Sequence, residues 1–446
     1  MFNQVRNIIS PQRIPFQAFD DAEKAWEQLH FIYERNCNFI RQHFHQYANQ
    51  NLPENQAIRA FYPAVRLQIT HHHDVDSRLS YGFVEGPGVY ETTVTRPDLF
   101  KQYLIEQITL LIKNHQCSVE IGESQTPIPL HFCFNQNEAL AEERPAILTD
   151  AVGAKMLNHF DVPNLAQIDD AIVNGTHPLT PGKAMPLAPF TAARVDYSLQ
   201  RLQHYTGTKP AHFQQFILFT NYQFYVEEFC HYAREQVQSD DSSYTELVLP
   251  GDILVDKLLS AEQIKAATAG VKKPQMPAYH LKRADGSGIT LVNIGVGPSN
   301  AKTITDHIAV LRPTAWLMVG HCAGLRSSQQ LGDYVLAHAY VREDHVLDED
   351  LPLFVPIPAL AEIQVALEEA VAEISGLKDY ELKRIMRTGT VASIDNRNWE
   401  LRYQEGPVQR LSQSRAIALD MESATIAANG FRFRVPYGTL LCVSDK

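Results

Sequence analysis

The feature that most constrains the fold is a set of uninterrupted apolar segments in the second half of the chain. Each ends in a turn, and several lead into an amphipathic helix. Five of them stand at residues 213–222, 289–297, 315–324, 333–341 and 437–445. A strand that is apolar at every position is buried on both faces, whereas a half-exposed strand alternates. The pattern therefore predicts an α/β fold with helices on both faces of a sheet.

The first part of the chain has a different pattern. Residues 20–50 and 99–113 show the three- and four-residue periodicity of amphipathic helices, and residues 65–70 and 89–95 alternate like strands. Residues 128–134 are expected to form another strand. These elements predict a smaller N-terminal α+β domain.

A chain of 446 residues exceeds what one hydrophobic core usually serves, which favours two domains. The region around 174–192 is rich in Gly and Pro and poor in charge, which is typical of a linker. We therefore expect an N-terminal domain at 1–175, a linker at 176–192 and a catalytic domain at 193–446.

Charge and targeting signals narrow the classes of function. The formal net charge is −12 and the pI is near 5.8, which argues against a broad nucleic-acid-binding surface. No stretch reaches the 18 apolar residues of a membrane span, and the N-terminus lacks a signal-peptide core. We expect a cytoplasmic protein that contacts neither nucleic acid nor membrane.

Metal chemistry has little support in the sequence. The six cysteines are scattered without a CxxC pair, which is typical of reduced thiols and gives no structural zinc site. The run His71-His72-His73-Asp74 places adjacent side chains in different directions, so a solvated turn is the better interpretation. We expect no metal and no required cofactor.

Ligands of such folds bind beyond the carboxyl ends of the strands. That rule singles out five segments of this chain, which are Thr220–Tyr222, Gly295–Asn300, Gly320–Gly324, Asp420–Glu422 and Ser444–Asp445.

Two carboxyl groups in these segments could carry chemistry. Asp445 follows the apolar run LLCV, where partial burial would raise its pKa and suit a general acid. Glu422 lies on a strand–helix turn, where a carboxylate can accept two hydrogen bonds from a vicinal diol. By position alone, Asp445 could equally cap a loop and Glu422 could favour a helix dipole.

The turn Gly295–Asn300 also admits two interpretations. Backbone amides at a helix start can bind an anion, yet the turn is neither GxGxxG nor a P-loop, and a plain tight turn fits as well. No GxSxG elbow is present, which argues against nucleophilic acyl chemistry.

Taken together, the motifs resemble the nucleoside phosphorylase superfamily, and within it the AMP nucleosidases. The superfamily has a Met-Glu pair on a strand–helix turn and Ser-Asp at a later strand end, here Met421-Glu422 and Ser444-Asp445. The resemblance extends through LVNIGVGPSNAKT, WLMVGHCAGLR and DNRNWELR, and into the first domain through YETTVTRPDLFKQYL. It implies a three-layer catalytic domain with a central mixed sheet.

The resemblance also implies an activity and roles for residues. AMP would be hydrolysed to adenine and ribose 5-phosphate, with Asp445 protonating the base at N7, Glu422 holding the ribose hydroxyls and Met421 packing beneath the sugar. Further substrate-binding residues are expected at Gly295, Gly297, Gly320, His321, Ser444, Thr220, Asn221 and Arg397.

Two departures from the phosphorylase pattern point to water as the nucleophile. The loop that binds phosphate in phosphorylases corresponds here to Thr220–Phe224, which has no cation. The arginine before their Gly-Ser-Cys-Gly turn is Met318 here, and the serine is His321. Loss of bidentate anion contacts should cripple phosphorolysis. His321 is a candidate for positioning water, although it could simply be a packed histidine.

Several features stay open at this level. The 5′-phosphate could be bound by any of Lys302, Arg326, Arg342, Arg384, Arg387 and Arg397. By resemblance we expect a homohexamer that ATP activates through a regulatory first domain and that phosphate inhibits. Relatives continue past Ser-Asp, so a chain ending at Lys446 is expected to be truncated or incompletely given.

Two other functions compete with hydrolysis. A nucleoside or nucleotide phosphorylase would need phosphate, and the missing arginines speak against it. A catalytically silent nucleotide-sensing protein would not need the acid, so retention of Glu422 and Asp445 speaks against that.

Overall fold

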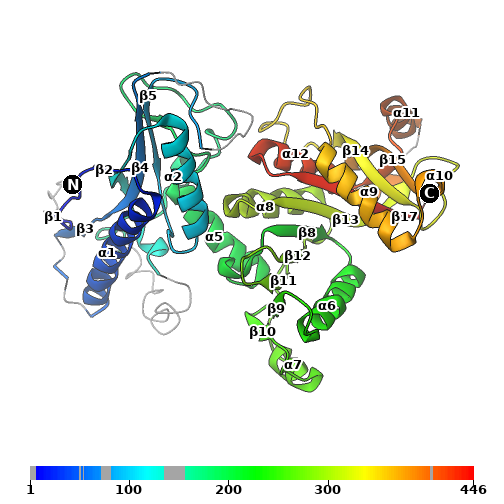
Figure 1. The fold of residues 1–446 in the computed structure, drawn as a ribbon, viewed down its shortest axis with the longest axis horizontal. Helices are drawn as coiled ribbons and strands as arrows, with labels where there is room; N and C mark the ends of the chain where they lie inside the picture. The colour runs from blue at the N-terminus through cyan, green and yellow to red at the C-terminus, as the bar shows by residue number, and fades with distance from the viewer. Residues whose placement is uncertain are drawn as a thin grey trace. The chain divides into compact units, whose positions relative to one another are not determined.

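The computed structural model describes residues 7–49, 52–53, 55–71, 82–134, 156–401 and 405–445 (Figure 1). The chain divides into two compact units, Met1–Tyr197 and Ser198–Lys446. Of the His71–Asp74 run, only His71 lies within the described residues.

The first unit combines a mixed sheet with two long helices. The sheet has the strand order β2-β6-β4-β5-β7, and β1 pairs with β3 in a separate small sheet. The elements are β1 Asn7–Ile9, β2 Gln17–Phe19, α1 Ala22–Ala48, β3 Gln56–Ile58, β4 Phe61–Ile69, β5 Gly88–Thr93, α2 Lys101–His115, β6 Val119–Pro127, η1 Leu130–Phe132, η2 Leu165–Gln167 and β7 Met185–Pro186.

Two predictions for this unit need correction. The segment 128–134 is not a strand: it contains the 3-10 turn η1, in which Phe132 N donates to the carbonyl of Pro129. Its apolar side chains are buried by a turn, and a short apolar run does not distinguish that from a strand. Residues 176–192 include β7, which pairs with β5, so part of the expected linker belongs to the sheet of the first unit.

One helix connects the two units. α5, Ala192–Thr206, begins at the end of the expected linker, and the division between the units falls within it, after Tyr197.

The second unit is built on a ten-stranded mixed sheet with the order β10-β9-β11-β12-β8-β13-β16-β15-β14-β17, in which β13 also pairs with β17. Its strands are β8 Phe216–Thr220, β9 Tyr244–Leu249, β10 Ile253–Val255, β11 Ala278–Arg283, β12 Ile289–Asn293, β13 Ala315–Gly324, β14 Tyr334–Glu343, β15 Met386–Ile394, β16 Ala418–Asp420 and β17 Tyr437–Asp445.

Helices and turns complete this unit after α5. They are η3 Pro210–His212, α6 Gln223–Gln238, α7 Ala261–Thr268, α8 Pro298–Ile308, η4 Ala309–Leu311, α9 Ala361–Ser375, α10 Asp379–Ile385, η5 Trp399–Leu401, α11 Glu405–Ser414 and α12 Ser423–Phe433.

Two neighbouring residues of β17 show that helices cover both faces of the sheet. A Cβ added to Gly430 of α12 would lie 2.5 Å from the Tyr437 ring, and one added to Gly438 would lie 2.4 Å from Ile363 of α9. Because successive strand residues point to opposite faces, α12 and α9 lie on opposite sides of β17. The expected three-layer α/β arrangement is confirmed.

Pairing brings the predicted segments to one region of the sheet. β8 runs parallel to both β12 and β13, with Thr220 opposite Asn293 and Phe219 opposite Met318. β16 runs antiparallel to β13 and places Leu419 opposite Ala323. The turns after β8, β12 and β16 therefore converge on the middle of β13. α8 and α12, which follow two of these turns, pack side by side (Figure 1).

Candidate active site

Glu422 is the buried centre of this region. Its side chain is 1% exposed, and it occupies the N-cap position of α12. One carboxylate oxygen, Oε1, accepts a 2.6 Å hydrogen bond from the backbone N–H of Gly297. Burial, and secondarily the charge of Asp420, raise the pKa of Glu422, while the Gly297 amide opposes the rise. The carboxyl group is thus held rigidly by a turn 125 residues away in sequence.

Asp420 anchors the strand–helix turn that presents Glu422. Its carboxylate accepts a 2.5 Å bond from Ser393 Oγ and a 3.0 Å bond from Ser423 N, and Ser423 Oγ also donates to it. Ser393 Oγ in turn accepts from Ala424 N at 2.8 Å. Burial raises the pKa of Asp420, and the serine donors oppose that rise. This network ties β15 to the first turn of α12.

Asn221 lies beside Glu422 and carries an unused acceptor. Its side chain hydrogen-bonds the Glu422 carboxylate, which assigns the amide nitrogen as the donor. Its Oδ1 is buried and has no partner among the described residues. That oxygen is 3.6 Å from where a Cβ on Gly320 would stand, so it faces the backbone of β13. An orphan buried acceptor indicates a donor that binds there.

Two tyrosines enclose His321. The ring centroids of Tyr222 and His321 are 4.1 Å apart, and those of Tyr225 and His321 are 5.4 Å apart. Burial lowers the pKa of His321, and the charge of Asp445 opposes this shift. The pKa of Tyr222 is raised by burial and then by Glu422 and Asp445, which places all three groups within electrostatic reach of one another.

Ser444 and Asp445 stand at the end of β17, where Asp445 pairs with Ala323 of β13. Ser444 Oγ lies 2.6 Å from Asp445 Oδ1, to which it donates, and 3.5 Å from the carbonyl of Cys322. The sequence analysis expected Asp445 to be partly buried, whereas the Ser444 and Asp445 side chains are both exposed among the described residues. Asp445 nonetheless lies near enough to influence His321 and Tyr222.

Glycines keep the backbone accessible beside Glu422. Gly295 and Gly297 have φ values of 68° and 115°, which disfavour any side chain. A Cβ at Gly297 would meet nothing within 4 Å, so the backbone next to the carboxylate borders open space. A small ring or hydroxyl-bearing group could approach closely there.

The other predicted residues divide into two groups. Thr220 is fully buried, and its Oγ1 accepts from Tyr222 N at 3.3 Å, so it shapes the loop around Asn221. Met421 is half-buried on the same turn as Glu422. Arg397, by contrast, lies in an exposed turn after β15, and no described contact joins it to the two carboxyl groups. Met318 is fully buried in β13.

The structure separates the candidates for the 5′-phosphate. Lys302 pairs with Asp306 at 2.7 Å, and the exposed Arg384 pairs with Glu381 on its own helix. Arg342 is 7% exposed, and both of its terminal nitrogens are buried without partners among the described residues. Arg326 and Arg387 meet at a separate cavity described below.

Metal-binding clusters and membrane-spanning helices were searched for within the described ranges. There, no three His, Cys, Asp or Glu side chains gather as a metal site would require. No described helix combines the length and apolar character needed to cross a bilayer.

The sequence analysis assigned no role to four residues that shape the site, which are Tyr222, Tyr225, Asp420 and Ser393. Tyr222 belonged to a segment already singled out, but the contact of its ring with His321 depends on the approach of β8 and β13. Tyr225 lies one helical turn further along α6. Asp420 adjoins the Met-Glu pair, whereas its partner Ser393 is 27 residues away and gave no sequence signal.

Comparisons with known proteins agree with this architecture. Residues 24–184 match the family described as bacterial AMP nucleoside phosphorylase N-terminus, and residues 257–446 match the phosphorylase superfamily. Among solved structures, AMP nucleosidase from Bacteroides thetaiotaomicron shares 27% identity with a TM-score of 0.43, covering 56% of this chain and 89% of that one. Uridine phosphorylase from Vibrio fischeri ES114 shares 13% identity with a TM-score of 0.40, covering 56% and 86%.

The similarity to curated proteins spans both units. AMP nucleosidase from Escherichia coli K12 is 46% identical over 430 residues, which cover 95% of this chain and 86% of that protein. The protein of the same name from Escherichia coli O157:H7 gives the same values. The chain therefore belongs to the AMP nucleosidase family, with the α/β fold of the phosphorylase superfamily in its second unit.

Proposed function

We propose that this chain hydrolyses the N-glycosidic bond of AMP to give adenine and ribose 5-phosphate. The observation that carries the proposal is its 46% identity to AMP nucleosidase across 95% of its length. The geometry around Glu422 supports it, because a buried, rigidly held carboxylate beside an open glycine turn suits a ribose diol. The reaction consumes one water and needs no cofactor.

Glu422 binds the ribose hydroxyls in this proposal. Its Oε1 is already held by Gly297 N–H, so the carboxylate cannot swing away when substrate enters. Positive charge develops on the ribose as the bond to the base breaks. Because burial raises the pKa of Glu422 to about 8, the carboxyl group is largely protonated near pH 7 and orients the ribose by hydrogen bonding. Its fixed dipole needs no reorganisation as charge develops. Met421, on the same turn, packs against the sugar.

Asn221 and His321 hold the attacking water. A bound water needs two or more polar partners, and the orphan Asn221 Oδ1 supplies one acceptor. Because the pKa of His321 is lowered, its imidazole is neutral near pH 7 and supplies a second acceptor. Two neutral acceptors, with no cation beside them in the loop Thr220–Phe224, favour water over a phosphate dianion as the nucleophile.

Asp445 is the general acid in this proposal. It donates its proton to N7 of adenine while the glycosidic electrons leave with the base, and the proton lost by the water restores the acid. Its place at the end of β17, within reach of Tyr222 and His321, supports the assignment. Ser444 orients the carboxyl group through its 2.6 Å hydrogen bond.

Regulation and assembly complete the proposal. We infer a cytoplasmic homohexamer that ATP activates and phosphate inhibits, with the first unit as the regulatory part. These points rest on the family to which the chain belongs.

Product analysis tests the activity directly. The chain is incubated with AMP in phosphate-free buffer, with and without ATP, and the products are separated. We expect adenine and ribose 5-phosphate, formed faster with ATP. Cleavage only after phosphate is added would identify a phosphorylase and overturn the proposed water site. No cleavage in either buffer would favour a nucleotide sensor.

The same assay tests the acid. Asp445→Asn should lower turnover by roughly 10²–10⁴-fold, the usual contribution of a positioned acid, while AMP binds nearly normally. The control is Asp240→Asn, at a side chain that is 99% exposed. Unchanged turnover of the Asp445 variant would remove it as the acid.

A further inference from the structure

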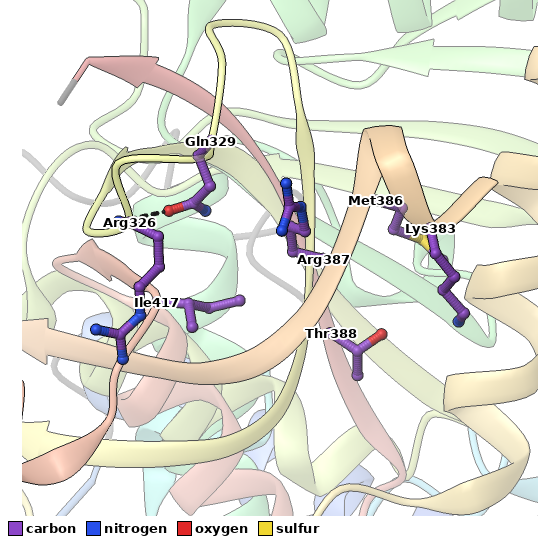
Figure 2. Close-up of a pocket in the computed structure, with 7 residues that line it drawn as sticks. All are labelled: Arg326, Gln329, Lys383, Met386, Arg387, Thr388 and Ile417. Atoms are coloured by element: carbon purple, nitrogen blue, oxygen red, sulfur yellow. Dashed lines mark hydrogen bonds between the residues drawn. The ribbon is translucent and has the colours of Figure 1, made fainter. Parts of the chain in front are cut away.

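A second feature of the catalytic unit is a cavity of about 350 Å³ with a cationic lining. Figure 2 shows Arg326 from the loop after β13, Lys383 from α10 and Arg387 from the start of β15 around it. Ile417, just before β16, forms part of the wall between the two arginines. Three cations at one cavity are unexpected in a chain whose net charge is −12.

The two arginines have spare hydrogen-bonding capacity. Arg387 donates from Nη2 to the carbonyl of Ser328 at 3.1 Å, but its Nε–H is buried and has no acceptor in the described part of the chain. No ion pair of Arg326 is found among the described residues. Its backbone N–H donates to Gln329 Oε1 at 2.9 Å, which pins the loop at the cavity.

An unpaired buried guanidinium N–H costs free energy, so this geometry is consistent with an anionic acceptor that completes it. Lys383 is partly neutralised, because its Nζ lies 2.8 Å from Glu368. The ammonium group retains further donors for a shared anion. The cavity therefore offers two guanidinium groups and one ammonium group against a single nearby carboxylate.

The cavity is distinct from the site around Glu422. Ile417 and Asp420 stand at opposite ends of β16, and three residues of strand span roughly 10 Å. Arg387 and Thr388 are likewise at the start of β15, whereas Ser393, which bonds Asp420, is near its end. None of the seven lining residues carries the chemistry assigned to Glu422, Asp445 or His321.

We propose that this cavity is a binding site for a phosphoryl anion. Arginine side chains match the oxygens of a phosphate group through paired N–H donors, and a lysine adds a point charge. The phosphoryl group could belong to free inorganic phosphate or to a phosphate monoester such as a nucleotide. The cavity volume accommodates either.

Isothermal titration calorimetry of the full chain tests the site, with inorganic phosphate and AMP as separate probes in low-salt buffer. The test variant is Arg326→Met/Arg387→Met, which keeps an unbranched apolar side chain at each position and removes two guanidinium groups. The control is Arg384→Met/Arg410→Met, which removes the same charge from exposed arginines paired with Glu381 and Glu343. Competition with AMP hydrolysis is avoided by using the Asp445→Asn background.

We expect inorganic phosphate to bind the control as tightly as the parent chain and the test variant at least about tenfold more weakly. AMP also binds at the Glu422 site, so its titration should lose a second binding event in the test variant alone. Loss for phosphate alone would identify free phosphate as the ligand, and loss for AMP alone would identify a phosphate monoester. Equal affinities in test and control variants, or no binding to the parent at millimolar concentration, would overturn the proposal. Circular dichroism checks folding, and Arg326→Met alone replaces the double variant if that one unfolds.

Discussion

At the scale of single residues, the decisive property of the site is the contrast between its two carboxyl groups. Glu422 is buried and hydrogen-bonded to Gly297 N–H, whereas Asp445 is exposed at the end of β17. A buried, fixed group suits binding of a sugar, and an accessible group suits proton exchange with base and water. The two environments are consistent with the roles proposed for these groups.

Glu422→Gln should separate the substrates AMP and deoxy-AMP. Loss of the carboxylate that holds the 2′-hydroxyl should lower kcat/KM for AMP by roughly 10²-fold or more. Deoxy-AMP lacks that hydroxyl, so it should be a poor substrate of the parent and lose less in the variant. Steady-state kinetics with both substrates measure this, with Glu343→Gln as the control. Equal losses for both substrates would remove Glu422 from 2′-hydroxyl binding.

At the scale of elements, buried polar contacts fasten helices to sheets in both units. In the second unit the Asp420–Ser393 contact joins the turn before α12 to β15. In the first unit Asp196 of α5 accepts from Tyr62 Oη of β4 at 2.6 Å and from Thr95 Oγ1 at 2.7 Å. Asp196 is only 4% exposed, so this anchor is inside the core of its unit.

The Asp196 anchor should make stability depend on pH. Burial raises the pKa of Asp196 from 3.8 to about 7, although Tyr62 and Thr95 oppose the rise. The folded chain then keeps a proton that the unfolded chain loses above pH 4, so the free energy of unfolding falls as pH rises from about 4 to about 7. The expected loss between pH 5 and 7 is about 2 kcal/mol.

Asp196→Asn should remove this pH-dependent part of the unfolding free energy, because the asparagine amide does not titrate. Urea unfolding of parent and variant at pH 5 and pH 7 measures it. As the pH rises from 5 to 7, the unfolding free energy of the parent should fall relative to that of the variant. A difference that stays constant over this range would show that Asp196 does not titrate there.

At the scale of the whole molecule, the surface of the second unit carries large apolar side chains in contact with solvent. Those above 65% exposure include Leu331, Phe354, Ile374 and Leu401. Exposed apolar surface of this kind often marks contacts between chains. The acidic net charge of −12 disfavours nucleic acid as a partner.

The assembly should contain six chains. Sedimentation equilibrium of the purified protein should give a mass of six times 50.4 kDa. The number six is what the family resemblance implies, and burial of exposed apolar side chains between copies would favour association in proportion to the area buried. A mass that stays at one chain over the micromolar range would contradict the hexamer.

Much of the fold was determined by local patterns. The apolar runs at 315–324 and 437–445 coincide with β13 and β17 to the residue, because a strand buried on both faces must be apolar throughout. The Met421-Glu422 and Ser444-Asp445 pairs were also legible in the sequence. The strand predicted at 128–134 was wrong, because burial alone does not specify whether an apolar segment is an extended strand or a turn.

Only the tertiary structure decided which of these residues meet. The hydrogen bond from Gly297 to Glu422 spans 125 residues, and the contact between the Tyr222 and His321 rings requires β8 to run beside β13. The cationic cavity likewise brings together Arg326, from the loop after β13, and Arg387, from the start of β15. Periodicity encodes which face of an element is buried, but strand order and register, set by packing of the whole chain, decide which side chains share a site.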